Sequence, residues 1–567
     1  MKSRAWLNGL VALMLLASAQ AQAQELIRNS GFESDGLHWG RNTWGKATYS
    51  TAVVTTHPHS ANKALKIEVT ALPTGAGYIF QQTHTLAKGR LYEASIWVRA
   101  VGTAQATFYL RKVGPWYNSF ACRTLNLDET LNPGWQQFTI RGGASEDTPV
   151  FFGIGFKEPG SIIVDDASLK DVTASSIHAN TSVVSTEAIP RSYFGLHINK
   201  GHHGIWPGLG QGIVRLWDTG TMWKNLEPSD DAWNWKRMDL YVNSLIHGHD
   251  PTCKILYTLG QTPAWAASNP QAASGYGAGA SSPPADIEEW REYVRTVATR
   301  YAGKIQYYEM WNETDVGGRT AFYSGSVEKM VEMTQAARQE ILAIDPTAKI
   351  IAPNVTASGL GWLESFLAAG GDAHVDLYSI HIYTALAPED ALIILTSFRE
   401  LLASYGVNKP VWDTEGRAAA PSGTTPTASE ARAAVARNYL TKWAFGASNF
   451  SWYAWDINTP NLVTLSVSES GSALADGGIA YREVANWLAG ARMLSKRIDA
   501  DNTWIVELLR SESDTEHIVW NPTGSRAFTI PLAWGATTTR DLTGASAALA
   551  GNTVTIGPEP ILLASKG

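Results

Sequence analysis

The spacing of hydrophobic and polar residues divides the chain into regions with different periodicities. From residue 25 to about 173, apolar and polar positions alternate over short segments separated by turn residues, and residues 91–98 and 135–140 are clear examples. Almost no helical periodicity interrupts this region. Short strands at such spacing predict a β-sandwich.

From about residue 190, short apolar runs alternate with segments whose apolar residues recur every three or four positions. Between Asp286 and Tyr301 these residues fall on one helical face. Another helix is expected to begin at Ser326, a typical capping residue, and to end at Asp345-Pro346. The expected strands are residues 193–198, 213–217, 254–259, 306–311, 349–353, 375–382, 410–414 and 450–455.

Eight strands with intervening helices within about 300 residues predict a (β/α)8 TIM barrel. The main alternative is a doubly wound open sheet. Such a sheet normally has a glycine-rich phosphate loop after its first strand, and Gly195-Leu196-His197 does not form one.

Short strands return after a helix that contains residues 481–488, at 504–509, 517–520 and 527–531. The sequence therefore predicts a multidomain protein with a small β-domain at the C-terminal end. The expected division is a signal peptide at 1–23, a β-sandwich at 24–173, a linker at 174–189, the barrel at 190–494 and the β-domain at 495–567. Residues 181–188 of the linker are a candidate strand of that last domain.

The first residues are typical of a secretory signal peptide. Lys2 and Arg4 precede an apolar run over residues 7–17, and small residues with a cleavage pattern follow at 19–23. The run is too short to span a membrane, and no later stretch approaches about 18 apolar residues. We expect a secreted or periplasmic protein without a membrane span.

Composition narrows the function classes. The content of 44% hydrophobic and 17% charged residues is that of an ordinary globular chain and excludes global disorder. The net charge of −7, without a basic stretch, argues against a nucleic-acid partner. The 23 tryptophans offer flat surfaces suited to sugar rings, although core packing also accounts for many of them. Cys122 and Cys253 form no metal or disulfide pattern, so we expect buried or free thiols.

Two expected strands end in glutamates that suit the hydrolysis of a glycosidic bond. The fourth ends in Asn312-Glu313 and the seventh in Glu415, and barrel active sites lie at the carboxyl ends of the strands. Such hydrolysis needs one carboxylic acid and one carboxylate. Asp413 is two residues before Glu415, on the same expected strand face, and is the rival nucleophile. Glu309 is expected to face the barrel interior without a catalytic role.

These motifs resemble the retaining glycoside hydrolases of clan A, which carry Asn-Glu at the end of strand four and Glu at the end of strand seven. The similarity covers residues 190–490 and is greatest to family 39, the β-xylosidase and iduronidase relatives, with family 5 more remote. Further supporting motifs are residues 223–228, 233–235, 262–266 and 379–383.

The resemblance implies roles for individual residues. Glu313 would be the general acid/base, Glu415 the nucleophile and Asn312 a partner of the sugar 2-hydroxyl. His381 and Tyr383 would help to separate the pKa values of the two carboxyl groups. Arg215 would hold Glu415 ionised, or form an inter-strand or surface salt bridge instead. Trp455 would be a sugar platform, with Trp265 and Trp452 as weaker candidates; each is equally a candidate for the core. No cofactor is expected for catalysis.

The N-terminal region resembles jelly-roll carbohydrate-binding modules, which open with an N-x-G-F-E motif and close with an I-D-D-x-S-L strand. Here the first motif ends at Glu33, and the second contains Asp165 and Asp166. The resemblance implies that the two ends pair, often around a structural calcium ion held by these acids. The alternative is that the acids are solvated. Trp116-Tyr117 is a candidate to stack on a glycan or to pack in the core.

These features together predict a secreted retaining β-glycosidase that cuts a polysaccharide internally. The alternatives are an exo-acting β-xylosidase-like enzyme, which releases single sugars from an oligosaccharide or polysaccharide, and a non-catalytic glycan-binding scaffold. The glutamate pair favours an enzyme. The sequence predicts neither the sugar, the linkage nor the oligomeric state.

Overall fold

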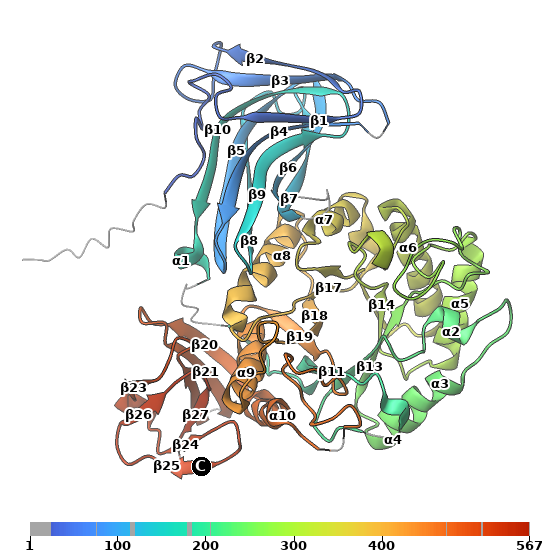
Figure 1. Ribbon diagram of the computed structural model, residues 1–567, viewed down its shortest axis with the longest axis vertical. Coiled ribbons are helices and arrows are strands. Elements are labelled where there is room, and N and C mark those ends of the chain that lie inside the picture. The colour runs from blue at the N-terminus through green and yellow to red at the C-terminus, as the bar shows by residue number, and fades with distance from the viewer. Residues whose placement is uncertain are drawn as a thin grey trace, which may run out of the picture.

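The computed structural model describes residues 24–74, 76–113, 119–177, 184–203, 206–471, 473–511 and 514–565. The expected signal peptide and Trp116-Tyr117 lie outside these residues. An N-terminal β-sandwich, a central barrel and a C-terminal β-region follow one another along the chain (Figure 1). Within the described residues, no helix has the length and apolar character needed to cross a membrane.

The N-terminal region forms two five-stranded antiparallel sheets, ordered β1-β4-β9-β6-β7 and β2-β3-β10-β5-β8. Alternate residues of the facing sheets, such as Ile96 and Phe108, are fully buried between them, which confirms the predicted sandwich. The strands are β1 (Gly40–Trp44), β2 (Thr48–Val54), β3 (Ala64–Ala71), β4 (Gly77–Leu86), β5 (Arg90–Val101), β6 (Thr103–Lys112), β7 (Ser119–Asp128), β8 (Gln136–Ala144), β9 (Thr148–Phe156) and β10 (Gly160–Asp171).

The central region contains a parallel sheet that wraps into a TIM-type barrel. Its strand order is β15-β14-β13-β12-β11-β19-β18-β17-β16, so that the first strand pairs with both the second and the last. The strands are β11 (Phe194–His197), β12 (Ile213–Leu216), β13 (Lys254–Leu259), β14 (Tyr307–Met310), β15 (Lys349–Ile351), β16 (Val355–Thr356), β17 (Tyr378–His381), β18 (Val411–Gly416) and β19 (Ala447–Trp452). Each predicted strand of this region is present, with ends that differ by a few residues.

Helices cover the outside of the barrel, and two of the predicted ones begin at residues whose side chains cap them. The Asp286 side chain accepts a hydrogen bond from Glu288 N, and the Ser326 side chain accepts one from Lys329 N, as expected for the two predicted helices. The helices are α1 (Thr173–Ser176), α2 (Trp223–Leu226), α3 (Lys236–Asp239), the π-helix η3 (Leu240–Ile246), α4 (His247–His249), α5 (Ile287–Arg300), α6 (Val327–Ile344), α7 (Leu360–Ala368), α8 (Leu392–Ser404), α9 (Ala428–Ala444) and α10 (Asp476–Leu488).

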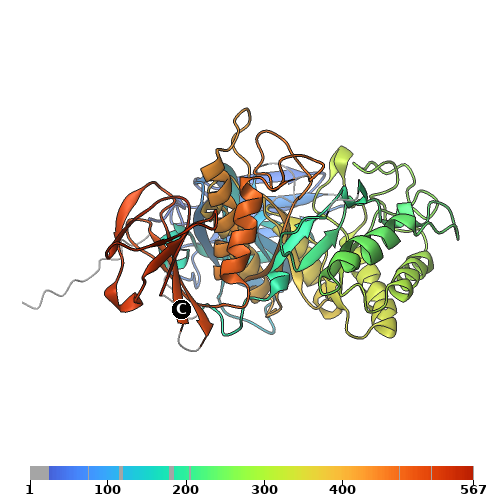
Figure 2. The same cartoon turned by 90° about the horizontal axis from the view of Figure 1, so that it is seen from below.

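The C-terminal region forms a six-stranded sheet, ordered β20-β21-β22-β27-β24-β25, and a β23-β26 hairpin-like pair. Figure 2 shows α9 and α10 between this sheet and the rest of the barrel. The strands are β20 (Arg492–Ile498), β21 (Trp504–Ser511), β22 (Asp514–Trp520), β23 (Arg526–Thr529), β24 (Thr538–Arg540), β25 (Ser546–Ala548), β26 (Thr553–Ile556) and β27 (Ile561–Ala564).

The linker before the barrel lies against the segment that follows it. Val184 N donates to Leu494 O at 2.8 Å, and Ile189 N donates to Ala491 O at 2.8 Å. No strand is assigned between residues 184 and 189, and residues 181–183 of the candidate strand lie outside the described residues. The predicted association is therefore present over 184–189 as backbone hydrogen bonds.

The sandwich packs on two barrel helices, α7 and α8, through β7 and β8 (Figure 1). Thr124 N donates to the Glu364 carboxylate at 2.6 Å, and Arg141 pairs with Glu400 at 3.2 Å. Polar contacts from both sheets of the sandwich therefore cross this interface.

Candidate active site

The backbone at the carboxyl end of β14 has an unusual conformation. Trp311 and Glu313 have φ values of 62° and 42°, in the left-handed region that non-glycine residues rarely occupy. Such residues cost about 1–3 kcal/mol each and cluster at functional sites. The Asn354 side chain holds this turn, because its Oδ1 accepts Glu313 N at 2.6 Å and its Nδ2 donates to Trp311 O at 3.1 Å. Asn354, which follows the neighbouring strand β15, therefore fixes the backbone that orients the Glu313 side chain.

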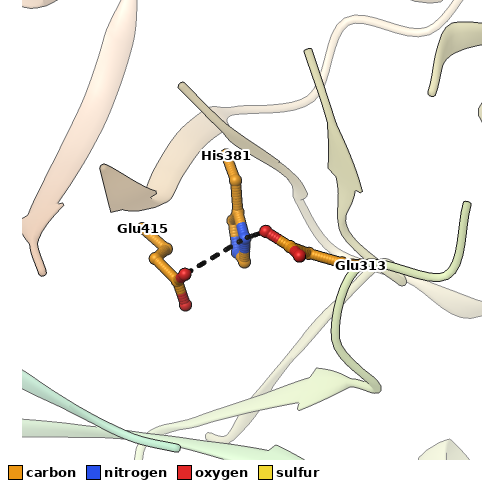
Figure 3. Close-up of side chains that lie close together, drawn as sticks. All are labelled: Glu313, His381 and Glu415. Atoms are coloured by element: carbon orange, nitrogen blue, oxygen red, sulfur yellow. Dashed lines mark hydrogen bonds and ion pairs between the residues drawn. The ribbon is translucent and has the colours of Figure 1, made fainter. Parts of the chain in front are cut away.

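Glu313, His381 and Glu415 meet at the carboxyl ends of three strands (Figure 3). His381 Nδ1 lies 2.9 Å from Glu313 Oε1 and 3.9 Å from Glu415 Oε1. One ligand atom from each of the three residues lies within 4.8 Å of the other two. The structure therefore brings together the two glutamates that the sequence placed on strands four and seven.

Arg215 lies beneath this group and is fully buried. It donates to Glu415 Oε2 at 2.8 Å, to Glu309 Oε2 at 2.8 Å and to Asn312 Oδ1 at 2.7 Å. Glu309 faces the barrel interior and also accepts hydrogen bonds from Thr258, Ser379 and Thr414. Arg215 is therefore in a buried network that includes the Glu415 carboxylate, and not in a surface salt bridge.

The two catalytic candidates differ in their electrostatic surroundings. Burial raises the pKa of Glu313 to about 7, against the opposing effect of Arg215 and with a contribution from Asp218. Burial also raises the pKa of Glu415, but His381, Arg215 and the Tyr383 hydroxyl favour its ionised form. Tyr383 donates to Glu415 Oε1 at 2.6 Å. Burial lowers the pKa of His381, and the Glu415 carboxylate opposes this effect.

The tryptophans proposed as sugar platforms are largely covered. Trp455 is 3% exposed and Trp452 is fully buried in β19. The Trp265 indole N–H donates to Glu227 O at 3.0 Å, and its ring packs against Trp223. In the free protein these residues offer little flat surface, because each contributes to the core around the site.

Asp413 does not lie on the Glu415 side of β18, contrary to the expectation from alternation. The pairing of β17 with β18 shifts between Ile380 and His381, so Asp413 and Glu415, two positions apart, lie on either side of an irregular stretch. Asp413 is buried and pairs with Lys442 at 2.7 Å. This ion pair removes Asp413 from the group formed by Glu313, His381 and Arg215.

A polar group that the sequence interpretation missed lies beside Glu313. Asp218 accepts the hydroxyls of Tyr276 and Tyr453, each at 2.6 Å. Asp218 is the second residue after β12, so its position near a strand end is a usable signal. Tyr276 comes from the loop rich in glycine, alanine, serine and proline after β13, and nothing local in the sequence indicated its partner.

The acids expected to hold calcium do not form a compact ligand set. Among the described residues, Glu33, Asp165 and Asp166 are not a group whose ligand atoms lie within 4.8 Å of one another. Asp165 accepts His59 N and Ser60 N, and Glu33 accepts Asn62 N and Lys63 N. Because Asp165 and Glu33 accept hydrogen bonds from backbone amides and the three acids are not grouped, their geometry does not fit a three-acid calcium site.

Two protein-family models match parts of the chain. A family model described as Glycosyl hydrolase catalytic core matches residues 285–487, and one described as Carbohydrate binding domain matches residues 24–140. The first match contains Glu313, His381 and Glu415. These matches confirm the predicted resemblance to glycoside hydrolases and to carbohydrate-binding modules. The protein is a glycoside hydrolase, its substrate is a carbohydrate, and enzymes of this kind need no catalytic cofactor.

Solved structures show a similar fold at low sequence identity. A glucosidase from Croceicoccus marinus is 15% identical, with 68% of this chain and 98% of that chain covered and a TM-score of 0.51. A family 39 β-xylosidase from Caulobacter crescentus is 15% identical, with 68% and 98% covered and a TM-score of 0.48. A family 39 enzyme from Xanthomonas axonopodis pv. citri is 16% identical, with 69% and 98% covered and a TM-score of 0.47. No curated protein matches the sequence.

Proposed function

We propose that the protein hydrolyses β-glycosidic bonds with retention of the anomeric configuration, with Glu415 as nucleophile and Glu313 as general acid/base. The observation that carries this proposal is the approach of the two carboxyl groups, whose ligand atoms lie within 4.8 Å of one another. Retaining enzymes have carboxyl groups about 5–5.5 Å apart, whereas inverting enzymes separate them by about 6.5–9.5 Å to admit a water molecule.

The electrostatics support the division of roles. Glu313, with a pKa of about 7, is protonated below neutral pH and donates its proton to the leaving oxygen. Glu415, which accepts from Arg215 and Tyr383, attacks the anomeric carbon as a carboxylate. Glu313 then removes a proton from a water molecule, whose oxygen attacks the anomeric carbon of the glycosyl enzyme and releases the sugar from Glu415. Asn312, fixed by Arg215, is the partner proposed for the sugar 2-hydroxyl.

Substitution of each glutamate tests these roles. Glu415→Ala should abolish turnover of an aryl β-glycoside, and added azide should restore it with an inverted glycosyl azide as product. Glu313→Ala should still form the glycosyl enzyme from substrates with good leaving groups, because protonation then matters less. Asp413→Asn is the comparison variant, because Asp413 is the rival nucleophile and pairs with Lys442. Azide rescue of the Asp413 variant instead of the Glu415 variant would contradict the assignment.

We also propose that the enzyme is exported and cuts a polysaccharide internally. The signal-peptide pattern and the match to a carbohydrate-binding domain support this proposal. Product sizing by mass spectrometry on a polysaccharide panel tests it. A ladder of oligosaccharides is expected, whereas the release of single sugars would favour the β-xylosidase-like alternative.

The same proposal treats the central domain as a (β/α)8 barrel in which β15 and β16 are two halves of one strand. Only residues 352–354 separate them. Ala352 N, within this gap, donates to Leu377 O at 2.9 Å, next to β17. This count supports the positions of Glu313 on strand four and Glu415 on strand seven.

A further inference from the structure

Arg417 follows β18, two residues after Glu415, and lies between two tyrosines of neighbouring strand ends. Its guanidinium carbon is 5.5 Å from the ring centre of Tyr383, after β17, and 5.5 Å from that of Tyr453, after β19. Tyr383 donates to Glu415 and Tyr453 donates to Asp218. Because barrel substrates bind where these strand ends meet, the guanidinium lies among groups that contact the substrate.

No carboxylate of the described residues neutralises this cation. Glu415 pairs with Arg215, and Asp218 accepts two tyrosine hydroxyls. Arg417 has no ion pair in the part of the chain that the structure describes, and its Nη1 atom is buried without a hydrogen-bond partner there. Arg215, the other arginine of the site, makes three hydrogen bonds to side chains. The guanidinium of Arg417 is therefore positioned by two aromatic rings and has an N–H group available for a ligand.

We propose that Arg417 binds a carboxylate of the substrate, so that the glycan carries an acidic sugar at or next to the cleaved bond. This inference rests on the proposed function, because it names the substrate class of the same site. A guanidinium presents paired N–H donors in a planar fork that matches a carboxylate. The two flanking aromatic rings restrain that fork, which lowers the ordering cost of binding.

The expected selectivity follows from the strength of a charged hydrogen bond. Loss of one such bond in a partly buried site lowers affinity by about 10- to 100-fold. A neutral sugar could accept hydrogen bonds from Arg417 but would leave its charge unpaired. The enzyme should therefore prefer an acidic glycan over a neutral glycan of the same size and linkage.

A matched pair of ligands tests the proposal. The first is a glucuronic-acid-containing oligosaccharide, and the second is the same compound with its carboxyl groups reduced to hydroxymethyl groups. Calorimetry in a Glu313→Gln background measures binding without consumption of the ligand. We expect about 10- to 100-fold tighter binding of the acidic compound, and loss of this preference in an added Arg417→Gln variant. Arg319→Gln, which removes the same charge from an exposed loop after β14, should keep it.

Three results would overturn the proposal. The first is equal or undetectable binding of both compounds. The second is an Arg417→Gln variant that weakens both equally, which would mean that Arg417 only positions Tyr383. The third is preference for a sulfated analogue over the carboxylated one. Failure of the proposed function is a separate result, because azide rescue with a neutral aryl glycoside tests the glutamates without any acidic ligand.

Discussion

The carboxyl groups of Glu313 and Glu415 lie close together but accept different donors. Glu313 Oε1 lies within hydrogen-bond distance of the His381 imidazole. Glu415 accepts an N–H of the Arg215 guanidinium and the hydroxyl of Tyr383. Burial raises the pKa of both carboxyl groups, and the Arg215 guanidinium that donates to Glu415 opposes this effect. This difference supports the proposed role of Glu313 as the proton donor.

Activity should therefore fall as pH rises through about 7, because Glu313 with a pKa of about 7 loses the proton it must donate. The acid limb should reflect protonation of Glu415. A pH profile of kcat/KM on an aryl glycoside measures both limbs. Asp218→Asn should move the alkaline limb to lower pH, since the Asp218 carboxylate contributes to the raised pKa of Glu313. An alkaline limb that is unchanged in Glu313→Ala would contradict the assignment.

Arg215→Met should be strongly destabilising. It leaves Glu309 and Glu415 buried without their cation, and breaking such a pair costs about 3–5 kcal/mol. The free energy of unfolding from urea denaturation measures the loss. The double variant with Glu309→Gln should recover part of the stability but not the activity, because Glu415 stays without its guanidinium donor. An unchanged urea midpoint in the single variant would refute this role.

At the scale of elements, the strand ends decide how the site is built. Asn354 follows β15 and fixes the turn after β14 through two hydrogen bonds. Asn354→Ala should lower kcat/KM by about 100-fold, since a displacement of about 1 Å can have this effect. A role in positioning predicts a larger loss for substrates with poor leaving groups, because Glu313 would donate its proton less well. An equal loss for all leaving groups would indicate a purely structural role.

The sequence alone predicts the main helices and strands and the candidate residues that lie on or next to them. Helical and strand periodicity is local, so α5, α6 and the barrel strands were expected close to their observed ends. Glu313 and Glu415 are candidates because strand-end position and residue type are both readable from the chain, and Arg215 is a candidate through the resemblance to clan A enzymes. Alternation failed for Asp413, because the irregular pairing of β18 depends on its neighbours in the sheet. The Asp218 contacts with Tyr276 and Tyr453 were not predictable, since distant loops bring them together.

At the scale of the whole molecule, the sandwich is packed on the barrel in addition to being joined to it in sequence. Glu364 of α7 accepts Thr124 N, and Glu400 of α8 pairs with Arg141. Two roles suit a carbohydrate-binding domain joined to a barrel, tethering to a polymer and stabilisation of the barrel. The contacts favour stabilisation, and a tethering role is compatible with them.

Deletion of residues 24–173 should lower the melting temperature, because it exposes the faces of α7 and α8 that the sandwich covers. Activity on a short soluble oligosaccharide should fall together with activity on the polymer. Calorimetry and rates on the two substrates measure this, with full-length Arg141→Ala as a milder variant of the same interface. An unchanged melting temperature with loss of activity on the polymer alone would show that the sandwich acts only as a tether.

The backbone hydrogen bonds between residues 184–189 and 491–494 have a consequence for the order in which the chain folds. Residue 184 is synthesised roughly 300 residues before its partner, an interval of about 15–60 s at ~5–20 residues per second. The β11–β19 pairing waits almost as long for its second strand. The sandwich is complete in sequence before either partner exists and can fold as the chain emerges. Barrel closure and attachment of the C-terminal sheet are then late events that follow synthesis of nearly the whole polypeptide.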